Sequence, residues 1–68
     1  MTMTMKDKYL KSINAIVTKS GNYDIERSIS FANEVSQYAN DHYGLNAAAT
    51  TSEGDALIDA LDEYFNCK

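Results

Sequence analysis

Apolar and small residues recur with helical spacing along three stretches of the chain, and the stretch from Ile25 to Tyr43 has the widest such face. When this stretch is wound at about 100° per residue, its apolar and small residues cover about half of the circumference. An ordinary surface helix needs an apolar stripe only a little over about 100° wide, so this pattern predicts a helix that is covered from two directions. We therefore expect it to be the central element of the fold.

A row of small residues follows this wide face at spacings of four, four and three positions. Small side chains allow the backbone of a second helix to approach closely. That second helix belongs either to the same chain, which is the commoner case, or to another copy of the protein. For the second case the predicted oligomer interface comprises the row and one neighbouring tyrosine: Ser28, Ala32, Ser36, Ala39 and Tyr43.

Local stop and start signals predict where the three helices begin and end. The first runs from Met5 to Ser20, where Ser20-Gly21 supplies a left-handed stop. The second runs from Asp24 to Tyr43, and either Asn22 or Asp24 caps its start. Gly44 ends it, and Leu45 makes the hydrophobic contact that accompanies such caps. The third runs from Ser52 to Phe65, with Ser52 and Asp55 as a short variant of the capping box.

These elements predict an all-α fold, a small three-helix bundle made of an antiparallel helical hairpin and a third amphipathic helix. The hairpin follows from a connection of only about four residues between the first two helices. The segment from Leu45 to Thr51 is long enough to return the third helix to its own hairpin or to pass it to a neighbour, and return is commoner. We expect one helical domain over residues 1–68, with flexible residues 1–4 and frayed residues 66–68.

The length of the chain limits its stability. A domain of 68 residues buries only about 60% of the surface of its unfolded chain, so it often needs reinforcement. The single cysteine, Cys67, cannot form an internal disulfide, and one cysteine with one histidine, His42, cannot supply a zinc quartet. We therefore predict no metal and no cofactor, and expect a homodimer or larger oligomer as the remaining reinforcement.

The charges are segregated along the chain. The net charge is −4, but residues 1–20 carry +3 and residues 21–68 carry −7. A net negative protein repels nucleic acid and anionic lipid, so we expect neither direct nucleic-acid binding nor membrane binding. The first five residues lack the apolar run of a signal peptide, and no stretch of the sequence could span a bilayer. These features predict a cytoplasmic protein.

Few residues offer catalytic chemistry. His42 shares the wide face with Tyr38, whereas Asp41 points about 100° away and cannot orient the imidazole. We expect His42 to be a partly buried structural residue or a pH-sensitive contact. Cys67 has no charged neighbour in sequence except Lys68, so it is an ordinary thiol. The sequence therefore predicts a protein that is not an enzyme.

The third helix carries an acidic stripe, which is the predicted partner-binding site: Asp55, Asp59, Asp62 and Glu63. A solvated face is the commoner explanation of such a stripe, and a surface for a basic partner is the alternative. If the first and third helices are parallel neighbours, Lys8 and Lys11 lie beside these acids and relieve their repulsion.

The function that these observations favour is binding to another protein. We expect a non-enzymatic, small, acidic, helical protein that acts as a regulator or inhibitor by occupying a partner's surface. The five tyrosines support this prediction, since tyrosine is enriched at interfaces. The alternative is a small-molecule or ion-binding domain with a pocket between protomers.

Overall fold

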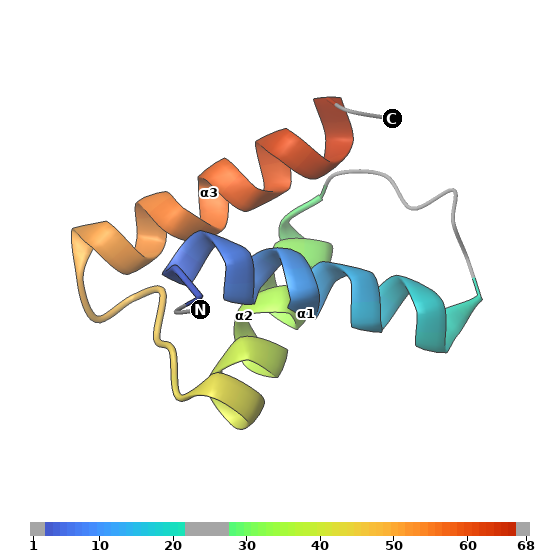
Figure 1. Ribbon diagram of the computed structural model, residues 1–68, viewed down its shortest axis with the longest axis horizontal. Helices are drawn as coiled ribbons and strands as arrows, with labels where there is room; N and C mark the ends of the chain where they lie inside the picture. The colour runs from blue at the N-terminus through green and yellow to red at the C-terminus, as the bar shows by residue number, and fades with distance from the viewer. Residues whose placement is uncertain (1–2, 22–27, 67–68) are drawn as a thin grey trace.

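The computed structural model describes residues 3–21 and 28–66, which form three helices packed together (Figure 1). The helices are α1 (Met5–Ser20), α2 (Ile29–Tyr43) and α3 (Thr51–Asn66). The described residues contain no strand. The prediction of an all-α protein with three helices is therefore confirmed.

Both ends of α1 are closed by local hydrogen bonds. The Thr4 hydroxyl accepts the Asp7 N–H at 3.1 Å, and the Asp7 carboxylate accepts the Thr4 N–H at 3.3 Å, which is a complete capping box. At the other end Gly21 adopts φ 71°, and its N–H donates to the Val17 carbonyl. The predicted bounds of α1 are confirmed, and Thr4 is its N-cap.

The start of α2 differs from the prediction. Ser28 is extended, with φ −149° and ψ 164°, and its hydroxyl accepts the Phe31 N–H at 3.1 Å. A serine with this geometry is an N-cap, so the helix begins at Ile29 and the predicted start at Asp24 is wrong. The predicted caps, Asn22 and Asp24, lie outside the described residues.

The end of α2 agrees with the prediction. Gly44 adopts φ 70°, a conformation that glycine takes at little cost, and its N–H donates to the Asn40 carbonyl at 3.1 Å. The Leu45 N–H then donates to the Ala39 carbonyl at 3.3 Å, and the Leu45 side chain is buried. The chain leaves α2 with its last carbonyls satisfied.

α3 starts earlier than predicted and uses different caps. The Thr50 hydroxyl accepts the Glu53 N–H at 3.1 Å, and the Thr50 carbonyl accepts the Gly54 N–H. The Glu53 carboxylate reaches back to the Thr50 hydroxyl and to the Asn46 N–H. The capping pair is therefore Thr50 with Glu53, and the predicted pair of Ser52 with Asp55 is wrong. Glutamate is long enough to reach back over the first turn, which aspartate at position 55 does not do here.

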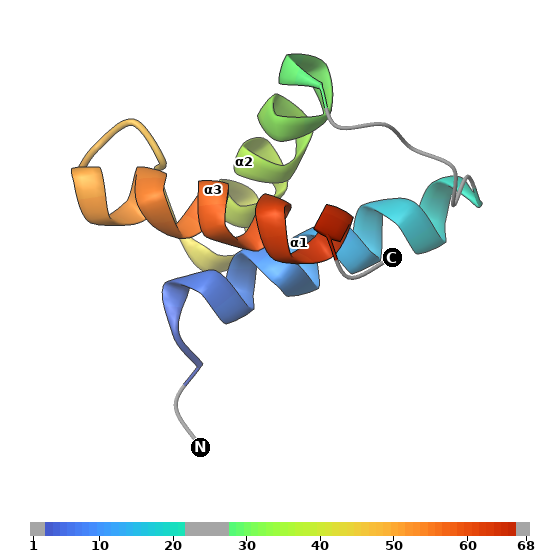
Figure 2. The ribbon, with the colours of Figure 1, turned by 90° about the horizontal axis from the view of Figure 1, so that it is seen from above.

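The central helix is α1 and not α2. α1 packs against both other helices, whereas α2 and α3 meet over a much smaller contact. α1 and α3 run side by side in the same general direction, and α2 crosses them steeply (Figures 1 and 2). The predicted antiparallel hairpin is therefore wrong: α1 ends at Ser20, α2 begins at Ile29, and the two helices cross steeply.

One hydrophobic core joins the three helices. Each helix contributes buried residues on one face, and the second residue after α2 adds one more: Tyr9, Ile13, Val17, Phe31, Val35, Ala39, Leu45, Ala56, Leu57, Ala60 and Leu61. On α3 two of these residues are alanines, which allow α1 to approach the α3 backbone closely. α3 therefore returns to its own chain, as the commoner alternative predicts.

Candidate functional site

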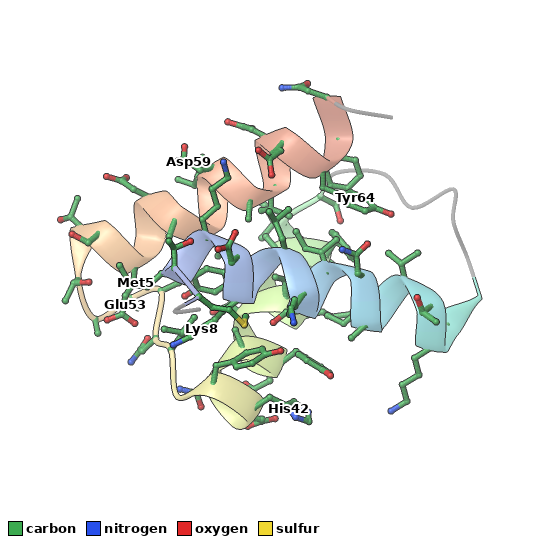
Figure 3. The ribbon with its side chains drawn as sticks, viewed as in Figure 1. Met5, Lys8, His42, Glu53, Asp59 and Tyr64 are labelled. Atoms are coloured by element: carbon green, nitrogen blue, oxygen red, sulfur yellow. The ribbon has the colours of Figure 1, made fainter. Side chains whose placement is uncertain are left out.

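The acidic stripe lies on the outer side of α3. Asp55, Asp59 and Glu63 are exposed, and Asp62 is half-buried. Figure 3 shows Asp59 at the outer edge of the helix, away from α2. The structure therefore brings the four predicted partner-binding acids onto one accessible surface.

One end of the stripe is neutralised by α1. The Lys6 Nζ lies 2.9 Å from Glu63 Oε1, and both side chains are partly exposed. The hydrogen bond and the charge of Glu63 raise the pKa of Lys6 above its usual value, and the charges of Asp59 and Asp7 raise it further. The prediction that α1 supplies a compensating cation is thus met by a residue other than those named. Lys8 lies on the side of α1 away from Asp59 (Figure 3), and Lys11 is exposed.

An exposed isoleucine stands among the acids. Ile58 retains 50% of its accessible surface, and Asp55 and Asp62 lie three positions before it and four positions after it. Residues at these spacings are neighbours on one helix face. We call Asp55, Ile58, Asp59 and Asp62 the Ile58 surface. The sequence pattern assigns Ile58 to the apolar stripe of the core, and only the position of α1 and α2 shows that the core does not cover it.

The predicted oligomer interface is divided between three environments. Ser28 is exposed and caps α2. Ala39 is fully buried in the core of its own chain. The remaining residues, Ala32, Ser36 and Tyr43, are half-buried, and Ala32 and Tyr43 pack against the core. Ala39 is therefore the member of the row that a second copy could not contact.

A cleft of about 530 Å³ opens between the C-terminal end of α1 and the side of α2. Each helix provides one wall of this α1–α2 cleft: Ile16, Lys19 and Ser20 from α1, and Glu34, Gln37, Tyr38 and Asp41 from α2. The four residues of α2 recur at spacings of three, one and three positions, which places them on one helix face. Sequence reasoning missed this site, although that spacing was visible.

Two contacts along α2 order the wall of the cleft. The rings of Tyr38 and His42 are stacked, with centroids 4.0 Å apart and planes 24° apart. The Gln37 side-chain amide donates to Asp41 Oδ1 at 3.1 Å. His42 is exposed, so the expectation that it is partly buried is wrong. His42 lies on the solvent-facing side of α2, so its imidazole is outside the core.

A buried tyrosine lies where α1 meets α3. Tyr9 has no exposed surface, and its hydroxyl has no hydrogen-bond partner among the described residues. Burial raises the pKa of this phenol above its usual value, and the charge of Glu53 on α3 raises it further. Tyr9 is one of the buried residues of the hydrophobic core.

Other expectations about chemistry remain predictions. The described residues contain no group of three or more His, Cys, Asp or Glu side chains that could hold a metal ion. Cys67 lies outside the described residues. None of the described helices combines the length and hydropathy needed to cross a membrane.

We found no match to this chain among protein-family models, curated proteins or solved structures.

Proposed function

We propose that this protein is a non-enzymatic binding protein that regulates or inhibits another protein by docking its Ile58 surface on a basic surface of that partner. The observation that supports the proposal is Ile58, a large apolar side chain half exposed within a group of carboxylates. Exposure of a single isoleucine is common, but an apolar centre with a charged rim is the usual anatomy of an interface.

The two parts of the surface have different energetic roles. Complete burial of an isoleucine side chain contributes about 1.5 to 3 kcal/mol, and half of the accessible surface of Ile58 remains to be buried. The carboxylates of Asp55, Asp59 and Asp62 produce a negative field that attracts and orients a basic partner. We therefore expect Ile58 to control the dissociation rate and the acids to control the association rate.

Lys6 restricts where the partner docks. Its ammonium group is paired with Glu63, so that end of the acidic stripe is partly neutralised by the chain itself. Asp55, three positions before Ile58, lies at the other end of the stripe. We place the partner on the Ile58 surface, and we give Glu63 a structural role.

We also propose that the protein acts in the cytoplasm as a homodimer. The support is the small size of the core and the accessible part of the small-residue row, Ala32 and Ser36. Light scattering over a range of dilutions tests the oligomeric state. A mass that corresponds to one chain at every concentration would remove the dimer from the proposal and leave the Ile58 surface unaffected.

The docking proposal is tested by capture of partners from a lysate of the native host. The test variant is Ile58→Ser, and the matched control is Ile29→Ser, because Ile29 is the more exposed isoleucine, at 83%, and lies on α2. We expect wild type and the control to retain the same partner, with salt-sensitive association, and Ile58→Ser to lose it. Equal capture by both variants would show that the Ile58 surface is not the site. Stabilisation by a small molecule without any partner would support a ligand-binding domain instead.

A further inference from the structure

We propose that the α1–α2 cleft binds a basic side chain of a partner protein, with arginine favoured over lysine. The chemistry that recognises it is a pair of carboxylates, Glu34 and Asp41, together with aromatic surface from Tyr38 and aliphatic surface from Ile16. This site lies on α1 and α2, so it is separate from the Ile58 surface of α3 and does not depend on that surface being functional.

Two carboxylates, Glu34 and Asp41, line the α2 wall of the cleft. Glu34 and Asp41 are seven positions apart on α2, which corresponds to two helical turns on the same face, and both side chains are exposed. Gln37 lies between them and donates to Asp41 Oδ1, so this carboxylate is held along the helix. Its second oxygen is still able to accept a hydrogen bond. A planar guanidinium has several donors in a fixed arrangement and suits such a wall better than an ammonium group.

Tyr38 and Ile16 suit the carbon part of the same arginine side chain. Tyr38 is stacked on His42 with ring centroids 4.0 Å apart, so its ring is oriented before any ligand arrives. A cation above an aromatic ring is attracted by the ring, and arginine makes this contact most often. Ile16 is half-buried and offers apolar surface on the opposite helix. An arginine side chain beside an apolar residue therefore matches both the apolar and the acidic lining residues of the cleft.

The charge across the cleft also sets the direction of the ligand. Lys19 lies on the α1 wall, facing the α2 wall with its two acids. A positive group is repelled from the α1 side and attracted to the α2 side. We infer that the cationic end of the ligand rests on α2 and that its apolar neighbour lies toward α1.

The experiment titrates the 15N-labelled full chain with a blocked tripeptide, acetyl-Leu-Arg-Leu-amide. Its control is the same peptide with citrulline, which has nearly the same shape and no charge. We expect saturable shifts of the amide resonances of Ile16, Gln37, Tyr38 and Asp41 with the arginine peptide, and only weak, non-saturating shifts with the citrulline peptide. Equal shifts with both peptides, or saturable shifts confined to α3, would overturn the proposal.

Two charge variants locate the site. Replacing Glu34 with Gln and Asp41 with Asn together should weaken binding of the arginine peptide at least about tenfold. The matched control replaces Asp55 and Asp59 with Asn, which removes the same charge on α3 and should leave peptide binding unchanged. Thermal unfolding shows that each variant is folded. Equal weakening by both double variants would show that the peptide responds only to the net charge of the protein, which would contradict a binding site in the cleft. Loss of partner capture through Ile58→Ser does not affect this outcome, so the two proposals can fail separately.

Discussion

α1 meets its two neighbours in different ways. Against α3 it runs side by side, with an ion pair from Lys6 to Glu63 at the rim, and α3 places the buried alanines Ala56 and Ala60 in the core. Against α2 it is crossed steeply, and its C-terminal end extends past the crossing (Figure 2). The α1–α2 cleft lies between that end and α2. The parallel contact buries surface and provides stability, whereas the steep crossing leaves ordered but accessible surface, which a binding site requires.

The largest expected effect comes from adding volume to the parallel contact. Ala60 has no exposed surface, so Ala60→Leu has to separate α1 from α3 and should lower the free energy of unfolding by about 1 to 3 kcal/mol. Ala32→Leu on the half-buried row of α2 should cost less, because part of the added side chain can reach solvent. Urea unfolding of both variants measures the difference. If Ala32→Leu is the more destabilising of the two, the more tightly packed contact is at α2 and not between α1 and α3.

A smaller effect, with the opposite sign, is expected at Tyr9. Its buried hydroxyl has no partner among the described residues, and burial of an unpaired hydroxyl costs about 1 to 3 kcal/mol. Tyr9→Phe should therefore leave stability at neutral pH unchanged or raise it by up to about 1 kcal/mol. A clear loss of stability in urea unfolding at pH 7 would mean that the hydroxyl is hydrogen-bonded in solution.

The same substitution has a predicted pH dependence. The pKa of Tyr9 is raised in the folded state, so the unfolded chain loses this proton first as the pH rises. The stability linked to Tyr9 is complete below about pH 10, the usual pKa of tyrosine, and decreases above it. We expect Tyr9→Phe to lose less stability than wild type between neutral pH and alkaline pH. Tyr38→Phe is the control, because Tyr38 is partly exposed.

The smallest effect concerns the rim of the parallel contact. Lys6→Gln removes the ion pair to Glu63 and should lower the melting temperature slightly at low salt and not at high salt, because exposed charges are screened. Lys8→Gln is the matched control, since Lys8 lies on the other side of α1 (Figure 3). Equal shifts for both lysines would show a general charge effect and no specific pair.

The sequence predicts the C-terminal ends of the helices better than their starts. The stops at Gly21 and Gly44 depend on hydrogen bonds to residues one turn earlier, and both are where the sequence places them. The starts of α2 and α3 are harder to predict from the sequence, because several residues near each start can act as caps. Ser28 and Thr50 are the caps in the structure. Ser30 follows two positions after Ser28, and Thr51 and Ser52 follow Thr50, so other hydroxyls near each start could form the same kind of bond.

The sequence by itself determined the three amphipathic helices and the acidic stripe of α3, because helical periodicity and capping involve residues within a few positions of each other. It could not determine that α1 is central, that Ile29 and Ile58 are exposed, or that Lys6 pairs with Glu63. Each of these depends on how the three helices pack against one another, which no single helix encodes. An apolar face shows only that a helix can be covered, and the packing of the other two helices decides which part of that face meets water.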